Sequence, residues 1–95
     1  MILCRVVGTV VATHRCDDIP GARYLLVQAT DMKGQGRTGY HVALDPLGAG
    51  PGELVLLSRG SSARQTESSH QKPVDAIVAG IVDQVDAHGH AVYRK

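Results

Sequence analysis

The amino-acid sequence predicts an all-β fold, a small five-stranded OB-like β-barrel. Two observations support this prediction. Short apolar segments alternate with polar residues at a period of two, and clusters of glycine, proline, aspartate and serine separate these segments. The connections are also too short for the helical crossovers of a parallel sheet. With 95 residues, the chain is expected to fold as a single domain, residues 1–95.

The longest strand is expected at the N-terminus. Every even-numbered residue from Ile2 to Ala12 is small and apolar, which predicts one buried face along a single strand. Gly8, in the middle of this segment, indicates a bend or a bulge. A polar, glycine-rich loop is expected at residues 31–39. The five strands are expected at residues 2–12, 24–28, 40–45, 53–58 and 76–85.

One short helix is expected between the fourth and fifth strands. Ser62 is followed three residues later by Gln65, which fits a capping box at a helix start, and Pro73 cannot continue a helix. The sequence HGH at residues 88–90 indicates a turn after the fifth strand. The last residues, 87–95, are expected either to form a short return strand or to be a flexible tail.

Charge and composition argue against nucleic acid and membranes as partners. Ten Lys and Arg balance nine Asp and Glu, a net charge of +1 without any basic run, and only three Tyr are available to stack on bases. No apolar run approaches the roughly 20 residues that span a bilayer. The N-terminal sequence MILCRVV lacks the pattern of a secretory leader, so Cys4 and Cys16 are expected to be reduced, idle thiols in the cytoplasm.

The sequence GAGPGE, which contains Gly48, Gly50, Gly52 and Glu53, first suggests a phosphate-binding loop. A dinucleotide fingerprint needs G-x-G-x-x-G before a helix, whereas these glycines are spaced by two and precede a strand. Glu53 would also place a negative charge where the phosphate should lie. We therefore expect a tight turn between strands.

The sequence GSSAR first suggests a nucleophilic serine. A hydrolase elbow would read G-x-S-x-G, and His70 and Asp75 would have to serve as partners of Ser61 or Ser62. The helix-capping role explains Ser62 better. Two weak histidine pairs, His88 with His90 and His14 with Cys16, supply too few ligands for zinc. Neither catalysis nor a metal or cofactor is expected.

Several segments, taken in order, resemble one known family. These are Ile19-x-Gly21-x-Arg23 leading into LLVQ, then VALDPLGAGPGE, VLLSRGSSAR and PVDAIVAGIVD. They are similar to the EutN/CcmL family, the pentameric vertex proteins of bacterial microcompartment shells. The likeness extends from Gly8 to Asp83, and the set of motifs in this order is highly specific.

The resemblance implies a cyclic homopentamer that caps the vertices of a shell whose flat faces are built of hexameric proteins. A thin core also gains from burying a second apolar face against another copy, and the odd-numbered residues of the first strand could supply one. The family motifs imply that Gly60, Ser61 and Ser62 lie near the five-fold axis. Arg64, with Leu3, Val7 and Val11, is expected at the subunit interface. The turn of Gly48, Gly50, Gly52 and Glu53 is expected at the rim, against adjoining subunits or hexamers.

Two further questions stay open at this point. A catabolic compartment is favoured over a carboxysome on overall likeness. The alternative function is that of a small OB-like barrel that binds an oligonucleotide or a small ligand on its open face, although Arg5, Thr9 and Thr13 supply little of the basic face this requires.

Overall fold

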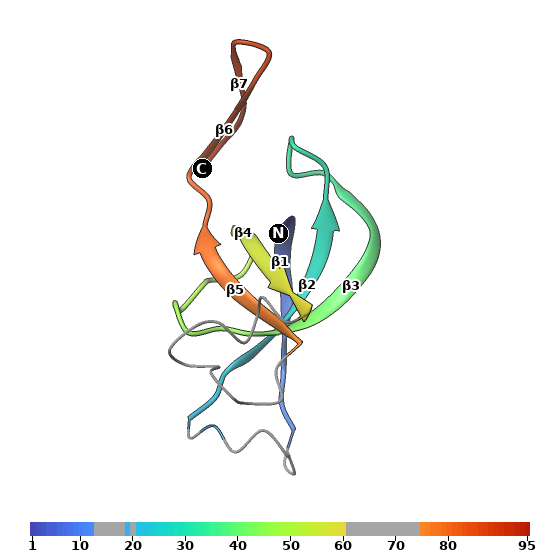
Figure 1. Ribbon diagram of the computed structural model, residues 1–95, viewed down its shortest axis with the longest axis vertical. Helices are drawn as coiled ribbons and strands as arrows, with labels where there is room; N and C mark the ends of the chain where they lie inside the picture. Colours follow the sequence, from blue (N-terminus) through green and yellow to red (C-terminus); the bar gives the residue numbers. More distant parts are fainter. Residues whose placement is uncertain (13–18, 20, 61–74) are drawn as a thin grey trace.

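The computed structural model describes residues 1–12, 19, 21–60 and 75–95. Five strands close into a barrel in the order β1-β2-β3-β5-β4, and two more form a separate hairpin (Figure 1). The barrel strands are β1 (Ile2–Val10), β2 (Tyr24–Thr30), β3 (Gly36–Leu44), β4 (Leu54–Arg59) and β5 (Ala76–Ile81). The hairpin consists of β6 (Gln84–Ala87) and β7 (His90–Arg94). The all-β, five-stranded barrel predicted from the sequence is confirmed.

The barrel closes unevenly. Four of its five strand contacts are antiparallel ladders, but β3 and β5 run parallel and pair only through Leu44 and Ile77. The predicted short helix between β4 and β5 falls within residues 61–74, outside the described residues, and the described residues contain no α-helix. Among them, no helix has the length and apolarity needed to cross a membrane.

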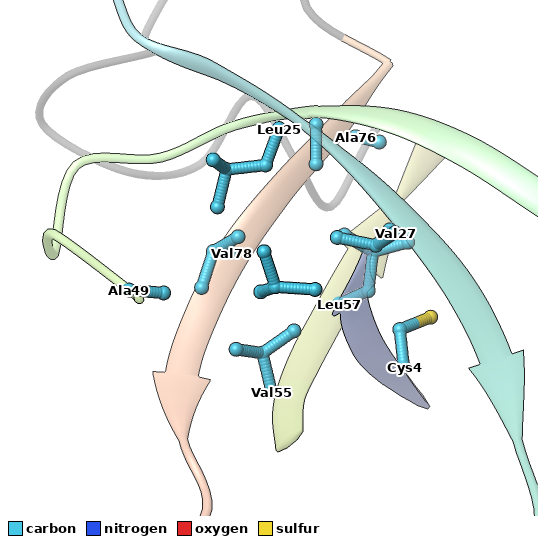
Figure 2. Packing of buried hydrophobic residues seen from close by; sticks show 10 residues of the cluster. Cys4, Leu25, Val27, Ala49, Val55, Leu57, Ala76 and Val78 are labelled. Carbon is cyan, nitrogen blue, oxygen red and sulfur yellow. The ribbon is translucent and has the colours of Figure 1, made fainter. Parts of the chain in front are cut away.

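The core is one layer of small side chains inside the barrel (Figure 2). Its fully buried members are aliphatic side chains and one thiol, and all five barrel strands contribute to it, β3 through Ala43. They include Cys4, Leu25, Val27, Val55, Leu57 and Val78. Burial raises the pKa of the Cys4 thiol, with the charge of Arg59 acting against the rise, so this cysteine is a buried, protonated core residue. Cys16 lies outside the described residues.

A bulge divides β1 into two halves. Val6 pairs with Val27 inside the barrel, but the next paired residue is Gly8, which lies opposite Leu26. The extra residue, Val7, reverses which side chains point inward, as a shift of one residue does in any strand. The bulge predicted at Gly8 is thus confirmed. The unbroken buried face predicted from Ile2 to Ala12 is wrong beyond Val6, and the strand ends at Val10.

Two loops are shorter than expected because a side chain or a glycine closes a tight turn. The Asp31 carboxylate accepts hydrogen bonds from the amides of Lys33 and Gln35, at 2.9 and 3.0 Å, and these contacts lower the Asp31 pKa. The β2 strand therefore continues to Thr30, directly before the predicted loop, and β3 begins within that loop at Gly36. At the other turn, His88 and Gly89 both have positive φ, 55° and 79°, as a two-residue hairpin loop requires.

The C-terminal strands resolve one of the open expectations. The strand predicted over residues 76–85 ends at Ile81, and β6 begins after it at Gln84. Residues 90–94 form the return strand rather than a flexible tail.

We predict that Leu57→Ala lowers the free energy of unfolding by about 3 kcal/mol, because it removes a fully buried side chain from the single core layer. Leu47→Ala is the matched control, since Leu47 is 50% exposed and its truncation should cost about 0.5 kcal/mol or less. Urea denaturation of both variants at equal protein concentration measures the difference. Equal losses would show that the barrel interior is not the main source of stability.

Candidate assembly surfaces

The GAGPG segment is a turn whose amides are occupied by carboxylates of the chain itself. Asp45, with a fully buried side chain, accepts hydrogen bonds from the amides of Leu47, Gly48 and Ala49 at 3.1, 3.0 and 2.9 Å. Arg23 lies 3.4 Å from the same carboxylate and donates a hydrogen bond to the Ala49 carbonyl at 3.2 Å. The sequence signal for this arrangement is Asp45-Pro46, because an aspartate side chain can accept hydrogen bonds from the amides that follow it in a turn.

Glu53 closes the other side of this turn. Its carboxylate accepts a short hydrogen bond from the Gly50 amide and forms an ion pair with Lys95 at 2.6 Å. Lys95 first, and the Gly50 amide second, lower the pKa of Glu53. Because the Asp45 and Glu53 carboxylates occupy these amides, the segment has no amide nest left for a phosphate, as the sequence indicated. Its role as a rim turn stays a prediction.

Arg5 joins three parts of the chain that are distant in sequence. Its guanidinium donates hydrogen bonds to the Gly34 carbonyl at 3.1 and 2.6 Å and to the Gly52 carbonyl at 2.7 Å. The same group lies over the Tyr93 ring, 6.0 Å from its centre. Arg5 therefore ties the β2–β3 turn, the GAGPG turn and the C-terminal hairpin to one point on β1.

The outer face of the barrel carries two rows of apolar side chains. Directly paired residues point to the same side of a sheet, so the register identifies each row. One row runs across β1, β4 and β5 as Leu3, Leu56 and Gly80. The other runs across β1, β2 and β3 as Gly8, Leu26 and Val42.

Two further apolar residues of the outer face, on β3 and β5, are covered by the chain itself. Leu44 and Ile77 are buried beneath Ile19, Ala22 and Tyr24, which form a small second cluster on the outside of the barrel. In the first two rows Leu3, Leu26 and Leu56 are half-buried. Val42 is 50% exposed, and its neighbour on the same outer side, Tyr40, is 62% exposed.

The residues predicted at the subunit interface do not form one continuous face. Leu3 lies on the outer face in the first half of β1, Val7 is at the bulge, and Val11 lies beyond the end of the strand, 93% exposed. The sequence did not indicate Leu26, Leu56 or Val42 as outer-face residues, because the side on which each lies depends on its pairing with neighbouring strands.

The predicted axial residues are only partly described. Gly60 follows β4, is exposed, has a positive φ of 65° and donates a hydrogen bond to the Asp75 carbonyl at 2.8 Å. Ser61, Ser62 and Arg64 lie outside the described residues, so their predicted roles at the axis and interface stay predictions. His88 and His90 are exposed at the hairpin turn, and the described residues contain no cluster of three or more candidate metal ligands.

The structure is thus that of a small closed β-barrel with two half-buried apolar rows on its outer face and a projecting hairpin. The family model described as "Ethanolamine utilisation protein EutN/carboxysome" matches residues 1–83. The carboxysome shell vertex protein CcmL of Synechocystis sp. is 44% identical over 95 residues, covering 100% of this chain and 95% of that protein.

Two other relatives agree with this match. The bacterial microcompartment shell vertex protein EutN of Salmonella typhimurium is also 44% identical, over 100% of this chain and 96% of its own length. The solved GrpN pentameric microcompartment shell protein from Rhodospirillum rubrum superposes with a TM-score of 0.81 at 40% identity, covering 92% of this chain and 100% of that one. The chain belongs to the EutN/CcmL family.

We predict that Gly34→Ala costs more stability than Gly21→Ala. Both glycines have positive φ, 82° and 67°, so either alanine adds backbone strain of about 1 kcal/mol. At Gly34 the new methyl group would also collide with the Arg5 guanidinium and lie 3.2 Å from the Tyr93 ring, whereas at Gly21 it meets no atom of the described residues within 4 Å. Displacing Arg5 should add about 1 kcal/mol. Urea denaturation measures the stability loss of each variant, in the wild-type chain and in a chain that carries Arg5→Met. If Gly34→Ala still costs as much more than Gly21→Ala in the Arg5→Met chain, the role assigned to Arg5 is contradicted.

We predict that the Glu53–Lys95 ion pair stabilises the protein at neutral pH and is lost in acid. Since the folded state lowers the Glu53 pKa, its contribution is complete above the ordinary glutamate value of about 4.3 and disappears as the pH falls through the lowered value. The thermal midpoint of the wild type should exceed that of Glu53→Gln at pH 7, and the two should converge in acid. Asp86→Asn, at an exposed carboxylate, is the control, and a gap independent of pH would refute the assignment.

Proposed function

We propose that this chain forms the pentameric vertices of a bacterial microcompartment shell in the cytoplasm. The observation that carries the proposal is the pair of apolar rows on two different sides of one barrel, in a chain of the EutN/CcmL family. Relatives that match over the whole chain are named as shell vertex proteins, and one related structure is named as a pentamer.

The two rows suit a head-to-tail contact between copies. They lie on opposite sides of β1 in the strand order, one towards β4 and β5, the other towards β2 and β3. A contact between two different faces repeats from copy to copy and closes into a ring when the rotation allows. Five copies meeting at one axis supply the five-fold position that a flat layer of hexameric proteins needs in order to close.

The glycines in these rows support the same reading. A β-carbon at Gly80 would lie 3.5 Å from Leu56, and one at Gly8 would lie 3.8 Å from Leu26, both ordinary contacts. Neither glycine has a positive φ. The chain's own packing therefore does not require glycine at either position. The missing side chain at each position would leave room beside a leucine for a side chain of another copy.

The proposal includes the family roles of the turn segments. Gly60, Ser61 and Ser62 are small enough for five chains to converge at an axis, and Arg64 can bind carboxylate or carbonyl groups of a neighbour. The turn of Gly48, Gly50, Gly52 and Glu53, stiffened by the Asp45 and Glu53 carboxylates, is a rigid surface for contacts with adjoining hexameric proteins.

The compartment type stays a prediction. Identity to a carboxysome vertex protein and to an ethanolamine-compartment vertex protein is 44% in both cases, so likeness does not separate a catabolic compartment from a carboxysome. A structural role is favoured over oligonucleotide binding, because Arg5, a basic residue of β1, is already occupied by the Gly34 and Gly52 carbonyls.

Native mass spectrometry at micromolar concentration tests the ring. We expect a species of five times the 10.1 kDa chain mass. Val42→Lys should shift it towards monomer, because a charge would enter an apolar contact. Met32→Lys is the matched control, since Met32 is 42% exposed but lies outside both rows. A wild-type chain that is monomeric at this concentration would overturn the proposal.

A further inference from the structure

The barrel wall has an opening between β3 and β5. These two strands run parallel and pair only through Leu44 and Ile77, and the described residues that precede this pair on the two strands are not paired with each other. A cavity of about 570 Å³, open to solvent, lies at this opening. The described residues that line it come from β3, from the end of β4 and from the start of β5: His41, Val42, Arg59, Gly60, Asp75 and Ala76.

Two basic side chains line this cavity from the inner side of the barrel wall. Arg59 pairs with Ala76, and His41 pairs with Val27, and both of these partners belong to the buried core. Because directly paired residues point to the same side of a sheet, the two basic side chains also lie on the inner side. Burial raises the pKa of the Cys4 thiol and the charge of Arg59 acts against the rise, so the guanidinium acts on the barrel interior.

The described part of the chain leaves both of these basic groups without a partner. Elsewhere in the structure, the guanidinium groups of Arg5 and Arg23 are occupied by carbonyl or carboxylate oxygens of the chain itself. By contrast, neither the Arg59 guanidinium nor the His41 imidazole forms a hydrogen bond or an ion pair with another described residue. Arg59 is exposed and His41 is half-buried, so a ligand that enters from solvent can reach both.

The donors at this opening suit a single oxyanion. A guanidinium presents parallel N–H groups that match a carboxylate or a phosphate, and an imidazole supplies one more donor. The β3 edge adds main-chain donors, since residues 36–42 have no ladder partner on the side away from β2 among the described residues. Asp75 also lines the cavity and adds a negative charge, so the balance of charge favours one anionic group over a polyanion.

We propose that the cavity between β3 and β5 binds the oxyanion of a small molecule, a phosphate or a carboxylate, with Arg59 as its main contact and His41 as a second donor. Its volume lies within the range of about 300 to 1,000 Å³ that is usual for small-molecule sites. The described lining comes from one copy of the chain. The inference therefore goes beyond the proposed vertex function and does not depend on the formation of a ring.

Titrations of the full chain followed by two-dimensional NMR test this binding. Inorganic phosphate and acetate are added separately, at neutral pH and at an ionic strength held constant with sodium chloride. We expect the amide signals of residues 41–42, 59–60 and 75–76 to shift along one saturable curve with at least one of the two anions. The anion that binds more tightly identifies the preferred group. The signals of the C-terminal hairpin, residues 84–94, should not follow this curve.

Three variants locate the binding. Arg59→Met should weaken it about fivefold or more, because the change removes the guanidinium and keeps a side chain of similar length. Arg59→Lys should weaken it less, since the charge remains while the parallel pair of donors is lost. Arg94→Met is the matched control, because Arg94 is exposed on β7 and lies outside the described lining of the cavity, and it should bind as the wild type does.

Two results would overturn the proposal. Shifts that grow without saturation, or that spread equally over the hairpin, would report general screening by salt and no binding at the opening. Saturable shifts that Arg59→Met leaves unchanged would place the anion elsewhere. If Arg59→Met folds poorly, the wild-type titration and Arg59→Lys decide the matter. A chain that binds the anion but forms no ring would overturn the vertex function alone.

Discussion

The interior of the barrel holds a single layer of small side chains, and the placement of the other apolar residues follows from this limit. Cys4, Val6, Leu25, Val27, Val55 and Leu57 fill the space, and no Phe or Trp is available to thicken it. Leu3, Leu26, Leu56 and Val42 must therefore lie on the outer face. A chain with so thin a core gains stability when other copies cover that face, so the same limit that shapes the fold favours assembly.

Polar contacts fix the conformations of the turns, which lie outside the thin core. Asp45 closes the GAGPG turn from within, Glu53 closes it from the other side, and Arg5 joins that turn to the β2–β3 turn and to the hairpin. These contacts explain why a glycine-rich loop, which resembles an anion site in sequence, is rigid and already neutralised. They also hold the hairpin against the rest of the chain through Tyr93 and Lys95.

Much of the barrel was predictable because it depends on local patterns. The period-two alternation identified five strands, Gly8 indicated the bulge, and the HGH sequence indicated the hairpin turn, each from residues adjacent in the chain. The errors arose where a distant residue decides. The β5 strand ends at Ile81, and the buried face of β1 ends at Val6, since register with a neighbouring strand overrides a continuous apolar pattern.

The sequence by itself determined the fold class, the aliphatic core and, through an ordered set of motifs, the family. Tertiary structure alone decided which apolar residues face outward and which polar groups hold the turns. Arg5 and Gly34 are 29 residues apart, and Arg5 and Gly52 are 47 apart, so no local pattern relates them. Side-chain direction in a sheet depends on register, and register is set by pairing between strands that are distant in the chain.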